Sequence, residues 1–342
     1  MIARKVSVSF ERLVGRVHHK LKSRRNPLGF CGAEAIYNEL AELGIRPMPC
    51  VRTIHRILVR RKLLTRKRRD RSRKGATLPC PIAEKQNDVH QVDFIVGHYL
   101  AARRPVVIFN RKDGATGLVA GCEEPDRSVQ RVLAFLTKDW RRHGIPRFLQ
   151  MDNDMSLTGG RMHPRSLGQL VRLCLACRVI PVFTPERRPA SNAAVERYNG
   201  LWQEKVWQRY RFRTLLQLQE HSRAFQEAYN AYLRRRLIRQ GNGARLETCV
   251  RSLPKRLRFR HPLPLCRGQI WFIRSLDEDG TIQVLNEPVR LSKQYAHQFV
   301  RVVIRTGPQT LSVYWRPSPD GKFKRIAHRA YKLREKANTP IF

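Results

Sequence analysis

The stretch "HQVDFIVGHYLAARRPVVIFNRKDGATGLVAGCE", residues 90–123, decides the fold class of this chain. It holds three short apolar runs separated by turn residues, a pattern that predicts three strands. Downstream, the spacing predicts a helix at 128–144, a strand at 146–152, a helix at 167–178, a strand at 179–183, a helix beginning near residue 192 and a long helix at about 215–238. This order predicts a mixed α/β sheet covered by helices.

The region before this core predicts a nucleic-acid-binding element. In "FCGAEAIYNELAELGIRPMPCVRTIHRILVRRKLL", residues 30–64, two runs with helical spacing are separated by a Gly/Pro turn, which is typical of a helix-turn-helix. The alternative is a helical hairpin that packs within the protein and does not bind DNA. The predicted DNA contacts are the cations in and just after the second helix: Arg52, Arg56, Arg60, Arg61 and Lys62.

The region after the core predicts a second flanking domain. Five short apolar runs lie between residues 268 and 317, separated by turn residues, and indicate a small β-barrel or sandwich. The predicted domains are 1–77, a basic helix-turn-helix with its linker; 78–238, the mixed-sheet core; 239–263, a basic linker; and 264–342, the small barrel.

The composition favours a polyanionic partner. Lys and Arg number 68 against 27 Asp and Glu, which gives a formal net charge of +41. A chain this basic binds nucleic acid readily because phosphate contacts release condensed counterions. A membrane surface would require an amphipathic anchor or a long apolar run, and the sequence shows neither. We therefore expect DNA as partner, no membrane, and a cytoplasmic, nucleoid-associated location, or a nuclear one in a eukaryotic host.

The cysteines do not suggest a disulfide framework. The 8 cysteines are scattered along the chain, so we expect reduced thiols. Cys174 and Cys177 form a CxxC within an apolar helical run, without a second pair of metal-ligand spacing nearby. Core packing is the favoured interpretation, with a metal or redox site as the alternative.

Three acids occupy related places in the predicted core. Asp93 lies inside the first strand, Asp152 ends the fourth strand, and Glu196 falls in the first turns of the helix after the fifth strand. An acid in an otherwise apolar strand costs free energy unless a cation or a donor compensates it. If the strands are neighbours, the three carboxylates meet and repel one another until a divalent cation neutralises them. All-oxygen ligation suits Mg²⁺ or Mn²⁺.

The position of Glu196 adds to this interpretation. The positive end of the helix dipole favours its ionised form, and Ser191 or Asn192 is the expected cap. Two ions held by such carboxylates serve phosphoryl transfer: one activates a water or a 3′-hydroxyl, and the other stabilises the leaving oxygen. Glu204, later in the same region, is the alternative third ligand.

The acids and their sequence context also resemble a known family. Asp93, "MDN" with Asp152, and "SNAAVERYNG" with Glu196 are similar to the DDE motif of insertion-sequence transposases with a retroviral-integrase-type core, over residues 80–235. The resemblance implies an RNase H-like core in which these acids hold two Mg²⁺ ions, with Mn²⁺ as substitute. It also implies a homo-oligomer acting on paired DNA ends, and it allows an accessory ATPase.

The chain departs from the family pattern at two places. Asp154 stands where the family often has Gly, and the 43 residues between Asp152 and Glu196 include a turn-rich insertion. The zinc-binding HHCC pattern of retroviral integrases is not evident. Further DNA contacts are expected from the cations near Glu196: Arg187, Arg188, Arg197 and Lys205.

The sequence therefore predicts a DNA transposase or integrase that cuts at 3′ ends and joins them to target DNA. An RNase H-like nuclease that only hydrolyses is one alternative, because the same metal ions serve both reactions. A non-catalytic DNA-binding regulator derived from a transposase is the other.

Overall fold

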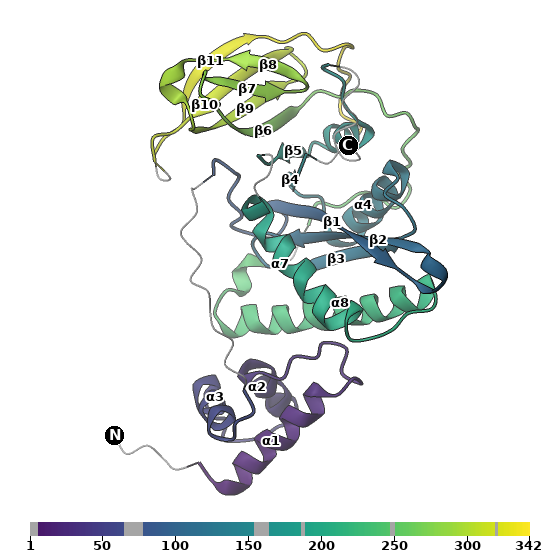
Figure 1. Ribbon diagram of the computed structural model, residues 1–342, viewed down its shortest axis with the longest axis vertical. Coiled ribbons are helices and arrows are strands. Elements are labelled where there is room, and N and C mark those ends of the chain that lie inside the picture. Colours follow the sequence, from purple (N-terminus) through teal and green to yellow (C-terminus); the bar gives the residue numbers. More distant parts are fainter. Residues whose placement is uncertain (1–5, 65–77, 154–163, 186–188, 247–249, 319–320) are drawn as a thin grey trace.

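The computed structural model describes residues 6–64, 78–153, 164–185, 189–246, 250–318 and 321–342. Three helices lie at one end of the long axis, a mixed α/β core in the middle and the C-terminal strands at the other end (Figure 1). Within the described residues, no helix has the length and apolar character needed to cross a membrane.

The N-terminal unit is a bundle of three helices. It consists of α1 (Val8–Lys22), α2 (Ala33–Glu42) and α3 (Val51–Arg60). Apolar side chains from all three helices form its core: Val14, Val17, Ile36, Leu40, Ile54, Ile57 and Leu58. The predicted helix pair at α2 and α3 is confirmed as structure, whereas α1 was not predicted. That the pair is a DNA-binding helix-turn-helix stays a prediction.

The core sheet is mixed. Its antiparallel strands are β1 (Val89–Tyr99), β2 (Pro105–Asp113) and β3 (Val119–Glu124). Its parallel strands are β4 (Phe148–Met151) and β5 (Ile180–Phe183), with β4 paired to β1 and β5 to β4. These strands follow the predicted order.

Helices cover both faces of this sheet. Helices α4 (Val129–His143) and α6 (Gln169–Ala176) pack in one apolar cluster, and α7 (Ala193–Trp202) and α8 (Leu215–Arg239) pack in another. Side chains alternate along a strand, so Val92 enters the α4 cluster while the next residue, Asp93, points to α7. The predicted mixed sheet covered by helices is confirmed.

The C-terminal strands continue the core sheet. They are β6 (Gln269–Ser275), β9 (Phe299–Arg305), β10 (Thr310–Trp315) and β11 (Lys324–Ala330), with the hairpin β7 (Thr281–Val284) and β8 (Glu287–Arg290) forming a separate two-stranded sheet. Within the described part of the chain, the large sheet has nine strands in the order β11-β10-β9-β6-β5-β4-β1-β2-β3.

A separate closed barrel is therefore not confirmed. Strand β6 pairs in parallel with β5, where Val182 lies opposite Trp271 and Phe183 opposite Phe272. The rings of Phe183 and Phe272 stack with centroids 5.0 Å apart. The physical reason is that β5 would otherwise be an exposed apolar edge, and pairing with β6 satisfies its backbone groups. Strand β11 was not predicted because its charged sequence is that of an edge strand.

The other edge of the sheet is closed by side chains of α8. Asn230 accepts a hydrogen bond from the amide of Val119 at 2.8 Å and donates one to its carbonyl at 2.8 Å. Gln226 accepts from the amide of Gly121 at 3.0 Å, and Gln219 donates to a carbonyl of β3. Helix α8 thus satisfies backbone groups of Val119, Gly121 and Glu123 at the free edge of β3, which opposes pairing of this edge with another strand.

The CxxC thiols belong to the core. Cys174 lies in α6 and Cys177 follows it, and both are fully buried among apolar side chains. Burial raises the pKa of both thiols, and that of Cys177 reaches about 12. The prediction of core packing for these two residues is confirmed.

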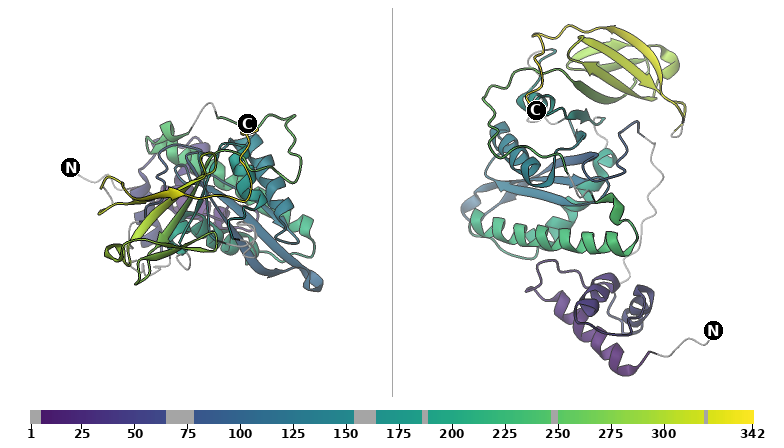
Figure 2. Two further views of the ribbon diagram at one scale, coloured as in Figure 1. Left: turned by 90° about the horizontal axis from the view of Figure 1, so that it is seen from above. Right: turned by 180° about the vertical axis from the view of Figure 1, so that it is seen from behind.

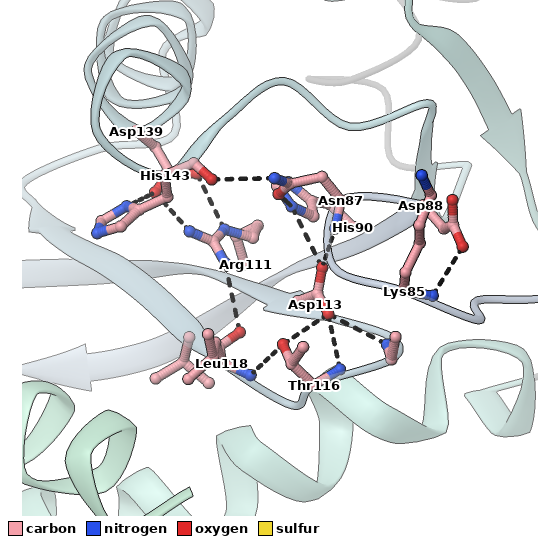
Figure 3. A network of polar contacts seen from close by, with 12 residues as sticks. Lys85, Asn87, Asp88, His90, Arg111, Asp113, Thr116, Leu118, Asp139 and His143 are labelled. Carbon is pink, nitrogen blue, oxygen red and sulfur yellow. Dashed lines mark hydrogen bonds and ion pairs between the residues drawn. The ribbon is translucent and has the colours of Figure 1, made fainter. Parts of the chain in front are cut away.

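A buried polar network braces the start of the sheet (Figure 3). The guanidinium of Arg111 on β2 donates to both carboxylate oxygens of Asp139 on α4, at 2.9 and 2.6 Å. His143 contacts the same carboxylate at 2.7 Å. Burial by itself raises the pKa of Asp139, but Arg111 and His143 hold it well below its usual range. This ion pair ties α4 to β2.

The three-helix unit packs against α8 (Figures 1 and 2). Phe30 meets the rings of Tyr229 and Tyr232 edge-on, with centroids 6.1 and 5.2 Å apart. Glu34 on α2 accepts a hydrogen bond from the hydroxyl of Tyr232 at 2.9 Å and forms an ion pair with Arg239. The contact between the two units is therefore part aromatic and part ionic.

Candidate active site

Strands β1 and β4 place Asp93 and Asp152 side by side. The parallel register pairs Gln91 with Gln150. Asp93 and Asp152 each lie two residues further along, so they are level with each other at the carboxyl end of β4. Asp93 is half-buried on β1, whereas Asp152 directly follows the last residue of β4 and is exposed.

Helix α7 starts at the same edge of the sheet and carries Glu196 in its first turn. Two glutamines of the paired strands hold the beginning of this helix. Gln150 donates to the carbonyl of Ser191 at 2.8 Å, and Gln91 accepts from the amide of Val195 at 3.3 Å. These contacts fix the helix start against both acid-bearing strands.

The capping prediction is wrong in its detail. Asn192 does occupy the N-cap position of α7, but its side chain makes no capping hydrogen bond. Its amide instead donates to the carbonyl of Val92 at 3.4 Å, and its side-chain oxygen accepts from Gln150 at 3.3 Å. Asn192 therefore anchors the helix to the sheet, because the sheet carbonyl lies within reach of the helix start.

The three carboxyl groups are electrostatically linked. Burial raises the pKa of Asp93 to about 6, and the charges of Asp152 and Glu196 add to the rise. Burial also raises the pKa of Glu196, again with a contribution from Asp152, which is opposite to the lowering expected from its place near the helix start. Each of these effects favours the protonated acid, so three ionised groups at this edge are costly without a counter-charge.

The three acids are near one another without forming a closed ligand set. Among the residues that the structure describes, no three His, Cys, Asp or Glu side chains are grouped closely enough to hold a metal ion. Repulsion among ionised carboxylates opposes closer approach, and a divalent cation would relieve it. The donors are all carboxylate oxygens, which is the chemistry that Mg²⁺ and Mn²⁺ prefer. The donor set therefore fits such ions.

Asn199 orients the carboxylate of Asp93, and Asn110 in turn holds Asn199. The side chain of Asn199 on α7 donates to one oxygen of Asp93 at 2.9 Å, and the amide of Phe94 donates to the other at 2.9 Å. Asn110, directly opposite Asp93 on β2, donates to the side-chain oxygen of Asn199 at 2.8 Å. The role of Asn110 was not predicted from the sequence. Its only signal in the sequence is an asparagine that ends the apolar run "VVIFN".

A third asparagine follows Asp152. Asn153 donates to the carbonyl of Thr184, at the end of β5, and accepts from the guanidinium of Arg274 on β6 at 2.8 Å. Arg274 was missed because the sequence places it in a separate domain. Only the pairing of β6 with β5 brings it to this edge.

The predicted DNA contacts on α3 fall into two groups. Arg52 and Arg56 are exposed on the outer face of α3, whereas Arg60 is ion-paired with Glu11 of α1 and Arg61 lies 3.9 Å from the same carboxylate. Lys62, just beyond the helix, is exposed. Arg60 and Arg61 therefore link α3 to α1, whereas Arg52 and Arg56 lie on the outer face of α3 and Lys62 lies just beyond its end.

The cations predicted near Glu196 are placed differently from one another. Arg197 is exposed, and its side chain donates to the carbonyl of Ala193 at 2.9 Å. Lys205 is 3.1 Å from Glu204 and 5.9 Å from the ring of Phe30, so it faces the three-helix unit. Arg187 and Arg188 lie outside the described residues.

Comparison with known proteins adds retroviral integrases as distant structural neighbours. No family model and no curated protein matches the chain. The HTLV-2 integrase catalytic core domain in complex with magnesium, in its trimeric form, is 16% identical with a TM-score of 0.31, covering 41% of this chain and 84% of that one. The simian T-cell lymphotropic virus intasome, in complex with a PP2A regulatory subunit, is 15% identical with a TM-score of 0.33, covering 94% and 99%.

The catalytic core domain of BIV integrase is 16% identical with a TM-score of 0.30, covering 45% of this chain and 99% of that one. TM-scores and identities this low support no shared activity. The function has to rest on the site of this chain.

Proposed function

We propose that the protein is a metal-dependent polynucleotidyl transferase of the transposase and integrase type, which cleaves DNA at 3′ ends and joins those ends to target DNA. The observation that carries the proposal is the convergence of Asp93, Asp152 and Glu196 from β1, β4 and α7, where the pKa of Asp93 is raised to about 6. A chain with a net charge of +41 that places these three acids at one edge of its sheet is suited to binding cations there and phosphates around them.

Each residue has a distinct role in this proposal. Asp93, Asp152 and Glu196 would hold two Mg²⁺ ions, or Mn²⁺ in their place. Bound ions would activate the attacking water or 3′-hydroxyl and stabilise the leaving oxygen. Asn199 keeps the Asp93 carboxylate in a fixed orientation through its 2.9 Å hydrogen bond. An RNase H-like core fits the order of strands and helices around these residues.

The remaining surfaces would bind and arrange DNA. Arg52 and Arg56 on the outer face of α3 are placed to contact a DNA groove, and Arg197 is placed to contact phosphate beside the acids. We propose a homo-oligomer on paired element ends, with an accessory ATPase as a further candidate partner.

The experiment is a Mg²⁺-dependent strand-transfer assay with DNA from the flanks of the encoding locus. Asp152→Asn and Glu196→Gln are expected to bind this DNA with unchanged affinity and to lose both cleavage and joining. Glu204→Gln is the matched control, because Glu204 is paired with Lys205 at 3.1 Å and should stay active. A result in which Glu204→Gln is inactive and Glu196→Gln active would reassign the third acid.

The same assay separates the alternatives. Cleavage without joining, dependent on Asp152, would identify a nuclease that only hydrolyses. DNA binding without cleavage or joining, in Mg²⁺ and in Mn²⁺, would refute the enzyme and favour a DNA-binding regulator.

A further inference from the structure

Arg274 connects the C-terminal strands to the edge that carries the acids. Its guanidinium donates to the side-chain oxygen of Asn153 at 2.8 Å and to the carbonyl of Thr184 at 3.2 Å. It also donates to the carbonyl of Gln283 on β7 at 2.9 Å. One side chain from β6 thus contacts the residue after Asp152, the end of β5 and the β7 strand.

The guanidinium is well suited to this arrangement. It is planar, it carries its donors in a rigid fork, and it lies 5.0 Å from the ring centroid of Phe272, which limits its rotation. A lysine at the same place would keep the charge, but its compact ammonium has no fork with which to reach all these acceptors together. The contacts of Arg274 therefore depend on shape as well as charge.

Asn153 passes this restraint to Asp152. The side-chain nitrogen of Asn153 donates a hydrogen bond to the carbonyl of Thr184, and its side-chain oxygen accepts one from Arg274. Both polar atoms of the side chain are therefore held. Asp152 itself is exposed and lies beyond the last residue of β4. Of its two chain neighbours, Met151 is fixed by the sheet, and Asn153 is fixed by Thr184 and Arg274.

We propose that Arg274 is a positioning residue for the candidate metal site: by holding Asn153 against the end of β5, it fixes the backbone that presents the Asp152 carboxylate to a divalent cation. The proposal rests on the proposed function, because it assumes that Asp152 is a ligand. It gives the C-terminal strands a part in building the site. Residues that orient a ligand in this way typically change metal affinity about 10–100-fold when substituted.

The experiment measures Mn²⁺ binding directly, by the loss of the free-ion EPR signal, on the full chain without DNA. It compares the wild type, Arg274→Lys, Asn153→Ala and their double variant. Arg329→Lys is the matched control, since Arg329 is an exposed arginine on β11. Asp152→Asn defines the binding that depends on this acid, and the unfolding temperature of every variant is recorded in EDTA.

We expect Arg274→Lys and Asn153→Ala each to weaken Asp152-dependent Mn²⁺ binding about tenfold. Because both residues act through the same contact, the double variant should bind Mn²⁺ at most about threefold more weakly than either single variant. Arg329→Lys should bind as the wild type does. Wild-type affinity in Arg274→Lys would overturn the proposal, as would effects that multiply in the double variant.

The unfolding temperatures and the Mn²⁺ binding of the wild type provide the remaining distinctions. If Arg274→Lys lowers the unfolding temperature without weakening Mn²⁺ binding, Arg274 only stabilises the sheet and the proposal is wrong. Should Arg274→Lys fail to fold, Asn153→Ala still decides, because it leaves β6 unchanged; wild-type binding in that variant overturns the proposal. If the wild type itself shows no Asp152-dependent binding, the proposed function fails, a result distinct from the failure of Arg274 alone.

Discussion

Replacing Asp93 by asparagine should stabilise the metal-free protein, an unusual result for a polar core substitution. The pKa of Asp93 is raised from its usual 3.8 to about 6. At about 1.4 kcal/mol for each pKa unit, the ionised carboxylate costs the folded state about 3 kcal/mol at neutral pH. Asparagine removes this cost. However, it offers one acceptor oxygen to the two donors that contact Asp93, the amide of Phe94 and the side chain of Asn199, so the variant loses about 1 kcal/mol of hydrogen bonding.

The expected net gain for Asp93→Asn is about 2 kcal/mol at pH 7 in EDTA. For a core of about 150–250 residues, a gain of about 2 kcal/mol raises the unfolding temperature by about 4–8 °C. Because the folded pKa is raised, wild-type stability falls as the pH rises from about 4 to about 6. The gain should therefore be full above about pH 7 and absent below about pH 4. Thermal unfolding followed by circular dichroism at several pH values measures it.

Two comparisons test the reasoning behind this prediction. Asp126→Asn is the control, since Asp126 is exposed, accepts from the amide of Ser128 at 2.8 Å and has a lowered pKa, so its loss should not stabilise. Adding Mg²⁺ should stabilise the wild type and leave Asp93→Asn unchanged. An unfolding temperature of Asp93→Asn at or below that of the wild type in EDTA would refute the cost assigned to the buried, ionised carboxylate of Asp93.

Two further predictions concern the scaffold. Glu34→Gln removes the carboxylate that pairs with Arg239 but leaves the ring contacts of Phe30, so it should cost no more than about 1 kcal/mol in urea unfolding; a loss above about 3 kcal/mol would contradict this. Asp139→Asn leaves the buried guanidinium of Arg111 without its carboxylate, which should destabilise the fold by about 3–5 kcal/mol in urea unfolding. A loss below about 1 kcal/mol would show that the pair is dispensable.

Local sequence pattern is enough to predict much of the core. Short apolar runs bounded by turn residues predict β1 to β3, and helical spacing predicts α4, α6 and α8, because each element must bury apolar side chains. Asp93 stands out within this pattern, because a carboxylate in an apolar strand needs a compensating partner. The use of the three acids as metal ligands stays a prediction.

Only the tertiary structure reveals the partners of those acids. Asn110 and Asn199 are far apart in the chain and meet through the pairing of β1 with β2 and the packing of α7. Arg274 reaches Asn153 only because β6 pairs with β5, whereas the sequence of β6 is equally compatible with a separate barrel. The physical reason is that a strand pattern specifies which face is buried, but not which other strand satisfies its backbone hydrogen bonds.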